Sequence, residues 1–176
     1  MLEWYEILII VIGSFVLLYV LGFIVNLAFV ATFKRKINEH RKAITIVLTQ
    51  KKEALLNLVL IMEKSDSKLD PRFFALLQDI DENYFSKIYS IETKKARETL
   101  SYVRQELAGI SNKSNDLQKN EEFKLSIASI NSLDEQFRVL LASYNADIIG
   151  YNYWIAFKPY RYLFLLNKTE KKDLIS

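Results

Sequence analysis

The stretch that most constrains the fold is residues 7–33, ILIIVIGSFVLLYVLGFIVNLAFVATF, which carries no charged side chain. A helix that crosses a bilayer needs roughly 20 apolar residues, and this stretch is longer than that. A single soluble domain is the alternative that such a stretch disfavours. We therefore predict a transmembrane helix over residues 7–33, preceded by a short N-terminal segment, residues 1–6.

A cleavable signal peptide is the main competing interpretation of an apolar N-terminus. It would have a basic start, an apolar region of only about 7 to 15 residues and a small-residue cleavage site. Here the acidic residues Glu3 and Glu6 precede the stretch, and basic residues follow it, namely Lys34, Arg35 and Lys36. By the positive-inside rule, this asymmetry predicts a single-pass protein of the cell membrane, with a short N-terminus outside and the body in the cytoplasm.

The net charge of +3 comes from two basic clusters, one directly after the apolar stretch and one at residues 168–172. We expect the first cluster, Lys34 to Lys36, to contact the anionic headgroups of the lipid bilayer. The body interleaves acidic and basic residues instead of presenting one basic face, so we expect no nucleic-acid partner. The chain has no cysteine, which excludes disulfides, thiolate catalysis and sulfur metal ligands and fits a reducing cytoplasm.

Apolar residues with heptad-like spacing continue past the apolar stretch and predict an amphipathic helix. They are Phe33, Ile37, Ile44, Leu48, Leu55, Val59 and Met62. No Gly or Pro lies between Gly22 and Pro71, so we predict one helix running from the membrane into the body. The segment EKSDSKLDP, residues 63–71, ends it.

Two further long helices are predicted from the same spacing. The second starts at Arg72 and carries Phe73, Leu77, Ile80, Tyr84, Ile88, Ile91, Val103 and Leu107; residues 108–120, AGISNKSNDLQKN, end it. The third carries Phe123, Ile127, Ile130, Phe137, Leu141, Tyr144, Ile148, Tyr151 and Ile155 and ends before Pro159. No segment alternates with period two for long enough to form a strand.

The predicted fold is all-α: the transmembrane helix continues into an elongated antiparallel up-down-up three-helix bundle over residues 34–160. The first and third helices would run parallel, which would place Asn57 near Tyr144 and Asn145 at the end far from the membrane. We predict a basic C-terminal tail over residues 161–176. Its four apolar residues, Leu163 to Leu166, are compatible with a short fourth helix against the bundle.

No constellation of catalytic, cofactor-binding or metal-binding residues emerges. The single histidine, His40, has no second histidine with which to share a metal, and a solvated or interfacial role is the better interpretation. On a helix, Asp79, Asp81 and Glu82 would point to different faces and be ordinary solvated charges. With only four glycines, the chain has no glycine-rich phosphate loop.

Asp134 occupies a core-facing register position, with Leu133 as the alternative residue for the core. If Asp134 points inward, it needs an Arg, a Lys or a backbone donor, because an unpaired buried carboxylate is costly. A structural ion pair or an exposed position is favoured over a functional site.

A Tyr-Asn pair occurs at Tyr144-Asn145 and again seven residues later at Tyr151-Asn152. The tyrosines fall on the core-facing positions and the asparagines at their edge. Since Asn is a poor helix former, another role should account for two copies. We favour asparagines that fix register with a neighbouring helix, and a ligand-binding Tyr/Asn patch remains the alternative.

Three blocks of this chain resemble the LemA family of bacterial, membrane-anchored helical-bundle proteins, whose biochemical activity is not established. The first block is ITIVLTQKKEALLNLV, with Lys51-Lys52 and Asn57 at the family's positions and Leu56 in place of the usual Pro. The second block is NDLQKNEEF, which lacks the usual Tyr-Pro. The third block is the Tyr-Asn repeat with Ile155 and Pro159, where Leu141 replaces a usual Arg. The resemblance covers about residues 26–159 and implies a divergent member with a bundle fold.

The first functional hypothesis is a non-enzymatic scaffold or interaction module at the membrane, with a protein partner or a homo-oligomer. The alternative is a membrane-tethered small-molecule sensor with a pocket at the distal end, near Asn57, Tyr84, Tyr144 and Asn145. An enzyme is least favoured, because the polar groups of an active site do not converge in the sequence.

Overall fold

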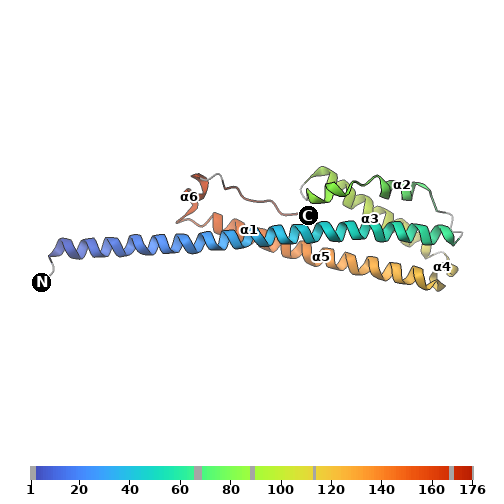
Figure 1. The fold of residues 1–176 in the computed structure, drawn as a ribbon, viewed down its shortest axis with the longest axis horizontal. Helices are drawn as coiled ribbons and strands as arrows, with labels where there is room; N and C mark the ends of the chain where they lie inside the picture. The colour runs from blue at the N-terminus through green and yellow to red at the C-terminus, as the bar shows by residue number, and fades with distance from the viewer. Residues whose placement is uncertain (1–2, 66–68, 88–89, 113, 167–168, 176) are drawn as a thin grey trace. The chain divides into compact units, whose positions relative to one another are not determined.

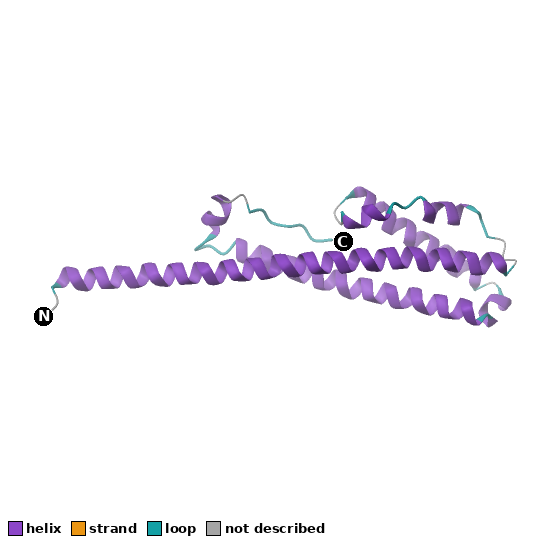
Figure 2. Ribbon diagram, viewed as in Figure 1, coloured by secondary structure: helices purple, strands orange, loops and turns teal. Residues whose placement is uncertain are grey.

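The computed structural model describes residues 3–65, 69–87, 90–112, 114–166 and 169–175, and all regular structure within these ranges is helical, with no strand (Figures 1 and 2). The helices are α1 (Trp4–Lys64), α2 (Arg72–Gln78), the 3₁₀-helix η1 (Glu82–Ser86), α3 (Ile91–Ser111), α4 (Asn115–Lys119), α5 (Glu121–Ile155) and α6 (Arg161–Leu166). The predicted all-α class is confirmed, and α6 provides the short C-terminal helix. The predicted core residue Ile88, the tail residue Lys168 and parts of both predicted breaks, 66–68 and 113, lie outside the described residues.

The chain forms two compact units. The first contains residues 1–38 and 145–174, and the second contains residues 39–144. The long helices α1 and α5 each contribute to both units. The C-terminal part of α5 therefore belongs with the N-terminal apolar helix, whereas the sequence grouped it with the body. The predicted boundaries at residues 34 and 160 stay predictions.

In the second unit, the apolar stripe of α1 packs as its spacing predicted. Its residues Ile44, Leu48, Leu55, Val59 and Met62 are all nearly inaccessible to solvent. They share the core with residues of the other elements, including Leu77, Phe85, Leu100, Val103, Leu107 and Ile130. Burial of these side chains is the main stabilising contribution, at roughly 1.5–3 kcal/mol for each large aliphatic residue.

The predicted second helix is wrong, because three separate elements replace it. The expected stripe holds through Phe73, Leu77 and Ile80, which are buried, but Ile91 is 71% exposed. The chain leaves the helix at Asp79, forms η1 and starts a new register at α3. Local capping explains the break, since Asp81 accepts a hydrogen bond from the Asn83 amide at 2.9 Å and the Ser90 hydroxyl accepts one from Thr93 at 3.1 Å.

The chain reverses direction between η1 and α3. Lys52 contacts the carbonyl of Ile80 and Thr45 contacts that of Phe85, so the α2–η1 segment runs antiparallel to α1. The reversal then lets α3 run back alongside α5. The Arg104 Nη2 atom donates to Asn131 at 2.9 Å, and Arg97 lies over the ring of Phe137, so α3 and α5 are antiparallel.

The prediction that the first and third long helices run parallel is also wrong. In the first unit, Asn26 of α1 contacts Trp154, whereas Phe33, further along α1, contacts Gly150, which lies earlier on α5. These contacts make α5 antiparallel to α1. The extra reversal between η1 and α3 is the physical cause, because it adds one change of direction to the predicted up-down-up path.

The first unit combines the apolar part of α1 with the end of α5, with α6 and with the tail. Aromatic contacts connect these elements: Phe29 stacks on Trp154 with ring centroids 4.4 Å apart, and Phe23 contacts both Tyr160 and Phe164. Gly22 and Gly150 leave no room for a side chain, because a Cβ atom there would overlap Tyr160 and Phe33 respectively. α1 is the one helix among the described residues that is long and apolar enough to cross a membrane.

Candidate functional site

A charged cluster joins three helices of the second unit. The Asp134 carboxylate on α5 lies 2.6 Å from Nζ of Lys51 on α1 and 2.7 Å from Nη1 of Arg104 on α3. The expected pairing of Asp134 with a basic partner is therefore confirmed, and Leu133 beside it is buried in the core. Two cations on one carboxylate satisfy its charge, so this cluster fixes the relative positions of three helices.

The neighbouring Lys52 makes a second polar contact inside the same unit. Its Nζ atom donates to the carbonyl of Ile80 at 2.8 Å and lies 3.3 Å from the carboxylate of Glu82. Lys52 thus satisfies a carbonyl that the break after α2 leaves without a helical partner. The sequence carried a signal for both lysines, since the pair Lys51-Lys52 interrupts an apolar stripe, but spacing did not reveal their partners.

Both tyrosines of the Tyr-Asn repeat are core residues, as expected. Tyr144 and Tyr151 are almost completely buried, and Asn145 and Asn152 are half-buried beside them. Burial raises the pKa of the Tyr151 phenol above its usual range. The repeat therefore combines two aromatic core residues with two amides at the edge of the helix.

Asn152 binds the C-terminal tail instead of a neighbouring helix. Its side-chain Nδ2 donates to the carbonyl of Lys172 at 2.8 Å, and its Oδ1 accepts from the Lys172 amide at 2.9 Å. The Lys172 ammonium also lies 5.8 Å from the centre of the Tyr151 ring, within cation–π range. The Tyr151-Asn152 pair thus binds both the backbone and the side chain of one tail residue.

The residues proposed for a distal sensor pocket do not come together. Asn57 is exposed in the second unit, whereas Asn145 belongs to the first unit. The predicted proximity of Asn57 to Tyr144 and Asn145 is wrong. It required α1 and α5 to run parallel, and they run antiparallel. Asn57 makes no contact that assigns it a role.

Tyr84 lines a different cavity, which lies wholly in the second unit. This cavity, of about 320 Å³, is open to solvent and lies between α2, η1 and α3. Its lining is mixed in polarity and consists of Leu76, Asp79, Ile80, Tyr84, Glu92, Lys95, Ala96 and Thr99. Asp79 and Glu92 place acidic groups beside Lys95, and this composition would suit a small polar molecule.

The remaining candidates lie apart from one another. His40 is half-buried on α1, and among the described residues no three His, Asp or Glu side chains are grouped as metal ligands would be. The basic residues Lys34, Arg35 and Lys36 are exposed on α1, and Lys36 lies over the ring of Phe33. Their contact with lipid headgroups stays a prediction.

In comparisons with known proteins, no family model, no curated protein and no solved structure matched this chain. The resemblance to the LemA family stays a prediction that rests on its three sequence blocks. Several residues of those blocks have contacts in the structure: Lys51 pairs with Asp134, Lys52 donates to the carbonyl of Ile80, and Asn152 binds the tail.

Proposed function

We propose that this chain is a single-pass membrane protein of the LemA type whose helical body is a cytoplasmic interaction or scaffolding module. The observation that carries the proposal is the continuity of α1, which runs without a break from Trp4 to Lys64. Its most apolar stretch is entirely unburied. Because α1 continues from this stretch into the second unit, a partner bound to the second unit would be attached to the membrane through α1.

The bundle arrangement within this proposal has four segments in place of three. α1 leads away from the bilayer, α2 with η1 returns, α3 leads away again and α5 returns. The proposed partner is a protein or a second copy of the chain, which would bind the long exposed faces of α1, α3 and α5. No nucleic-acid partner or cofactor enters the proposal.

Membrane insertion is tested with charges placed in the apolar stretch. The Leu17→Lys/Leu18→Lys variant should move the protein from the carbonate-resistant membrane fraction to the soluble fraction, because each charge at a bilayer centre costs about 2.5–3.5 kcal/mol. Ile46→Lys, an exposed position on the same helix beyond the stretch, is the matched control. Retention of the double variant in the membrane fraction would argue against insertion.

Orientation and partners need separate measurements. Protease added outside intact cells should leave the body uncut, and digestion of the body would reverse the proposed topology. Crosslinking in native membranes followed by mass spectrometry should then join the second unit to one protein or to another copy. Crosslinks that join only residues of the same chain would contradict a scaffold.

The cavity lined by Tyr84 supports a second candidate function, a small-molecule sensor. Soluble metabolites would be screened by thermal shift with the full chain in detergent. A ligand whose stabilisation is lost in Tyr84→Ala and Lys95→Ala, and kept in the exposed control Tyr102→Ala, would favour the sensor over the scaffold.

A further inference from the structure

The end of α5, the following turn and α6 form a C-terminal hairpin, residues 153–166, that packs on the apolar stretch of α1. Tyr160 in the turn contacts Tyr19 and Phe23, with ring centroids 5.0 and 5.5 Å apart. Phe164 of α6 contacts Phe23 at 6.2 Å. The hairpin therefore lies beside residues 19–23 of α1, and all these contacts are within the first unit.

The position of these contacts along α1 determines whether the hairpin lies at membrane depth. The charge-free stretch 7–33 would span about 40 Å as a helix, and the hydrocarbon core of a bilayer is about 30 Å thick. A crossing segment of about 20 residues can begin anywhere from residue 7 to about residue 14. Every such placement includes residues 19–23, so the hairpin lies at a depth that lipid occupies. A crossing that begins near residue 7 places residues 19–23 in the leaflet on the side of the body, and this is the placement that the basic residues after the stretch favour.

Polar groups of the turn and of α1 form hydrogen bonds that suit this depth, whereas the buried Oδ1 atom of Asn26 has no hydrogen-bond partner. The Tyr19 hydroxyl donates to the carbonyl of Pro159 at 2.7 Å, and Nδ2 of Asn26 donates to that of Trp154 at 3.4 Å. The amides of Tyr160 and Arg161 both donate to the carbonyl of Phe157 at 3.0 Å. Non-helical backbone persists at membrane depth only where its polar groups find protein partners.

This pattern also explains two of the four polar residues in the stretch, Tyr19 and Asn26, whereas Ser14 and Thr32 donate to carbonyls of their own helix. A tyrosine and an asparagine in a membrane helix are costly unless they bond to protein, and both contribute donors to the hairpin. The Asn26 side chain is buried against α5, with 1% of the residue exposed. Tyr19 and Asn26 are thus placed to bind a partner element at their own depth.

The outward surface of the hairpin is aromatic and aliphatic. Tyr153, Tyr162 and Leu165 are 60%, 76% and 55% exposed. Exposed aromatic residues of this kind gather at membrane–water interfaces. Basic side chains border the same surface, since Lys158, Arg161 and Lys171 are exposed, and long basic side chains reach from an apolar layer to lipid phosphates.

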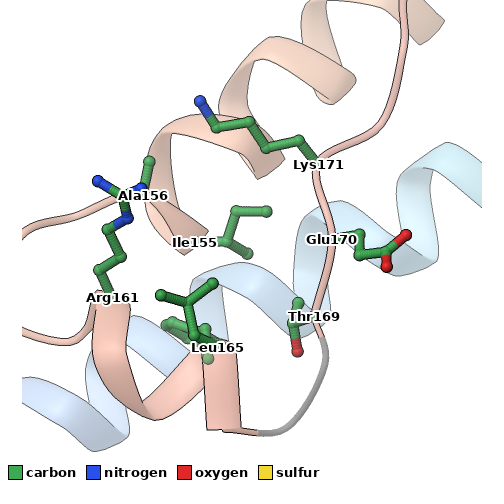
Figure 3. Close-up of a pocket in the computed structure, with 8 residues that line it drawn as sticks. Ile155, Ala156, Arg161, Leu165, Thr169, Glu170 and Lys171 are labelled. Carbon is green, nitrogen blue, oxygen red and sulfur yellow. The ribbon is translucent and has the colours of Figure 1, made fainter.

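A small cavity between α6 and the tail also combines an apolar surface with charged side chains at its border. It measures about 230 Å³ and has an apolar floor that includes Ile155, Phe164 and Leu165. Figure 3 shows Ile155, from the end of α5, between α6 and the tail, with Arg161 and Lys171 at the edge of the cavity. The apolar floor suits an acyl chain, and the lining carries the two basic side chains together with the carboxylate of Glu170.

We propose that the C-terminal hairpin is a second membrane element, which inserts beside α1 into the leaflet on the side of the body. Its partner is the lipid itself: Tyr153, Tyr162 and Leu165 contact acyl chains and the glycerol region, and Lys158, Arg161 and Lys171 contact phosphates. The proposal rests on the proposed crossing of the membrane by α1. The membrane anchor would then consist of α1 together with the hairpin, which covers one side of α1 within that leaflet.

The absence of native cysteine allows a direct depth measurement on the full chain. Single cysteines at Tyr162 and Leu165 carry spin labels in vesicles of phosphatidylethanolamine and phosphatidylglycerol. Accessibility to oxygen, which concentrates in lipid, is compared with accessibility to a water-soluble nickel chelate. Leu17 is the reference for the anchor, and the exposed residue Tyr102 of the second unit is the reference for water.

The expected result is an oxygen-to-nickel accessibility ratio at Tyr162 and Leu165 well above that at Tyr102 and close to that at Leu17. If Leu17 is in lipid and the two hairpin labels are in water, the hairpin proposal is overturned and the anchor stands. If Leu17 is also in water, the membrane crossing itself fails. Labels shielded from both reagents would indicate a protein or a second copy on this surface and would equally overturn lipid contact.

The two tryptophans give an independent readout without added labels. In Trp4→Phe, the emission of Trp154 should be quenched by lipids brominated near the headgroup, and Tyr162→Lys/Leu165→Lys should reduce that quenching. Both substituted residues are exposed, so unchanged far-UV circular dichroism should show that the fold is kept. Quenching of Trp154 by aqueous iodide in vesicles, to the extent seen in detergent, would contradict insertion.

Discussion

The Nζ atom of Lys51 lies 2.6 Å from Oδ1 of Asp134, which connects α1 to α5 across the second unit. The Asp134 side chain is 22% exposed and that of its other partner, Arg104, is 44% exposed. Lys51 is more deeply buried than either, so the loss of the carboxylate would leave a cation without compensation in a nearly dry position. Removal of one charge from the cluster should therefore cost more stability than the ion pairs themselves contribute.

Asp134→Ala should lower the free energy of unfolding by about 2–3 kcal/mol, somewhat less than for a fully buried pair, because Arg104 remains solvated. Denaturation of the full chain in detergent, followed by far-UV circular dichroism, measures this. Glu135→Ala is the control, since its pair with Arg138 is exposed on both sides and solvent screens it, so its loss should change stability much less than the loss of Asp134. Equal effects of the two variants would remove the structural role assigned to Asp134.

Thr93 holds the reversal that the sequence did not predict. Its buried hydroxyl lies within hydrogen-bond distance of the carbonyls of Tyr84 and Lys87. Thr93→Val keeps the shape and removes the donor, so it should cost about 1–3 kcal/mol, whereas Thr93→Ser should retain most of the stability. Thr99→Val, a helical threonine that bonds only within its own helix, is the control. A harmless Thr93→Val would mean that packing alone sets the reversal.

Gly150 and Gly109 should respond to alanine in opposite directions. A Cβ atom on Gly150 would lie 2.5 Å from the Phe33 ring, whereas one on Gly109 meets nothing within 4 Å. We expect Gly150→Ala to destabilise the protein by about 1–2 kcal/mol through overpacking. Gly109→Ala should stabilise it by up to about 1 kcal/mol through helix propensity. Thermal denaturation gives both signs, and a stabilised Gly150→Ala would refute the close approach of α1 and α5.

Asn152→Ala should free the C-terminal tail. Both backbone groups of Lys172 lose their hydrogen-bond partner, so its amide should exchange with solvent deuterium faster, by about five- to thirtyfold for a loss of 1–2 kcal/mol. Hydrogen exchange with mass spectrometry measures this on the tail peptide. Gln136→Ala, an exposed amide on the same helix, should leave the tail unchanged. If protection persists in Asn152→Ala, the contact with Tyr151 alone holds the tail.

Tyr151 should make stability sensitive to alkaline pH. Burial raises the pKa of its phenol above the usual value of 10.0. The neutral phenol is thus favoured in the folded protein, and this contribution is fully present below pH 10 and is lost as the pH rises through the folded pKa. Tyr151→Phe should reduce the alkaline loss of stability, and Tyr102→Phe serves as the exposed control. Parallel alkaline profiles for wild type and Tyr151→Phe would exclude this residue as the cause.

Much of the local structure was predictable because it depends on periodicity. The apolar stripe from Ile37 to Met62 and the buried tyrosines of the Tyr-Asn repeat occupy the predicted positions. The continuous helix from the apolar stretch into the body follows from the lack of Gly or Pro between Gly22 and Pro71. The partner of Asp134 was predicted as a class, a basic residue, but its identity depended on which helices face α5.

The reversal between η1 and α3 was missed because apolar spacing was carried across it. Ser90 and Thr93 form a recognisable capping pattern, and Asp81 precedes η1 as a cap, so the signals existed in the sequence. They competed with apolar residues at Tyr84, Ile88 and Ile91 that fitted an uninterrupted helix. One overlooked reversal then inverted the expected direction of α5.

The sequence by itself determined that the chain is helical, that one helix can cross a membrane and which residues face the core. These properties follow from local hydrophobicity and spacing, which each segment carries with it. Only the tertiary structure decided that α5 returns toward the apolar stretch, that Asn152 binds the tail and that Tyr19 and Asn26 bond to a C-terminal hairpin. The contacts of Tyr19 and Asn26 join residues more than a hundred positions apart, and their formation depends on the direction of every helix between them. Asn152 and the tail are closer in sequence, but the side chain that receives the tail is set by how the end of α5 packs.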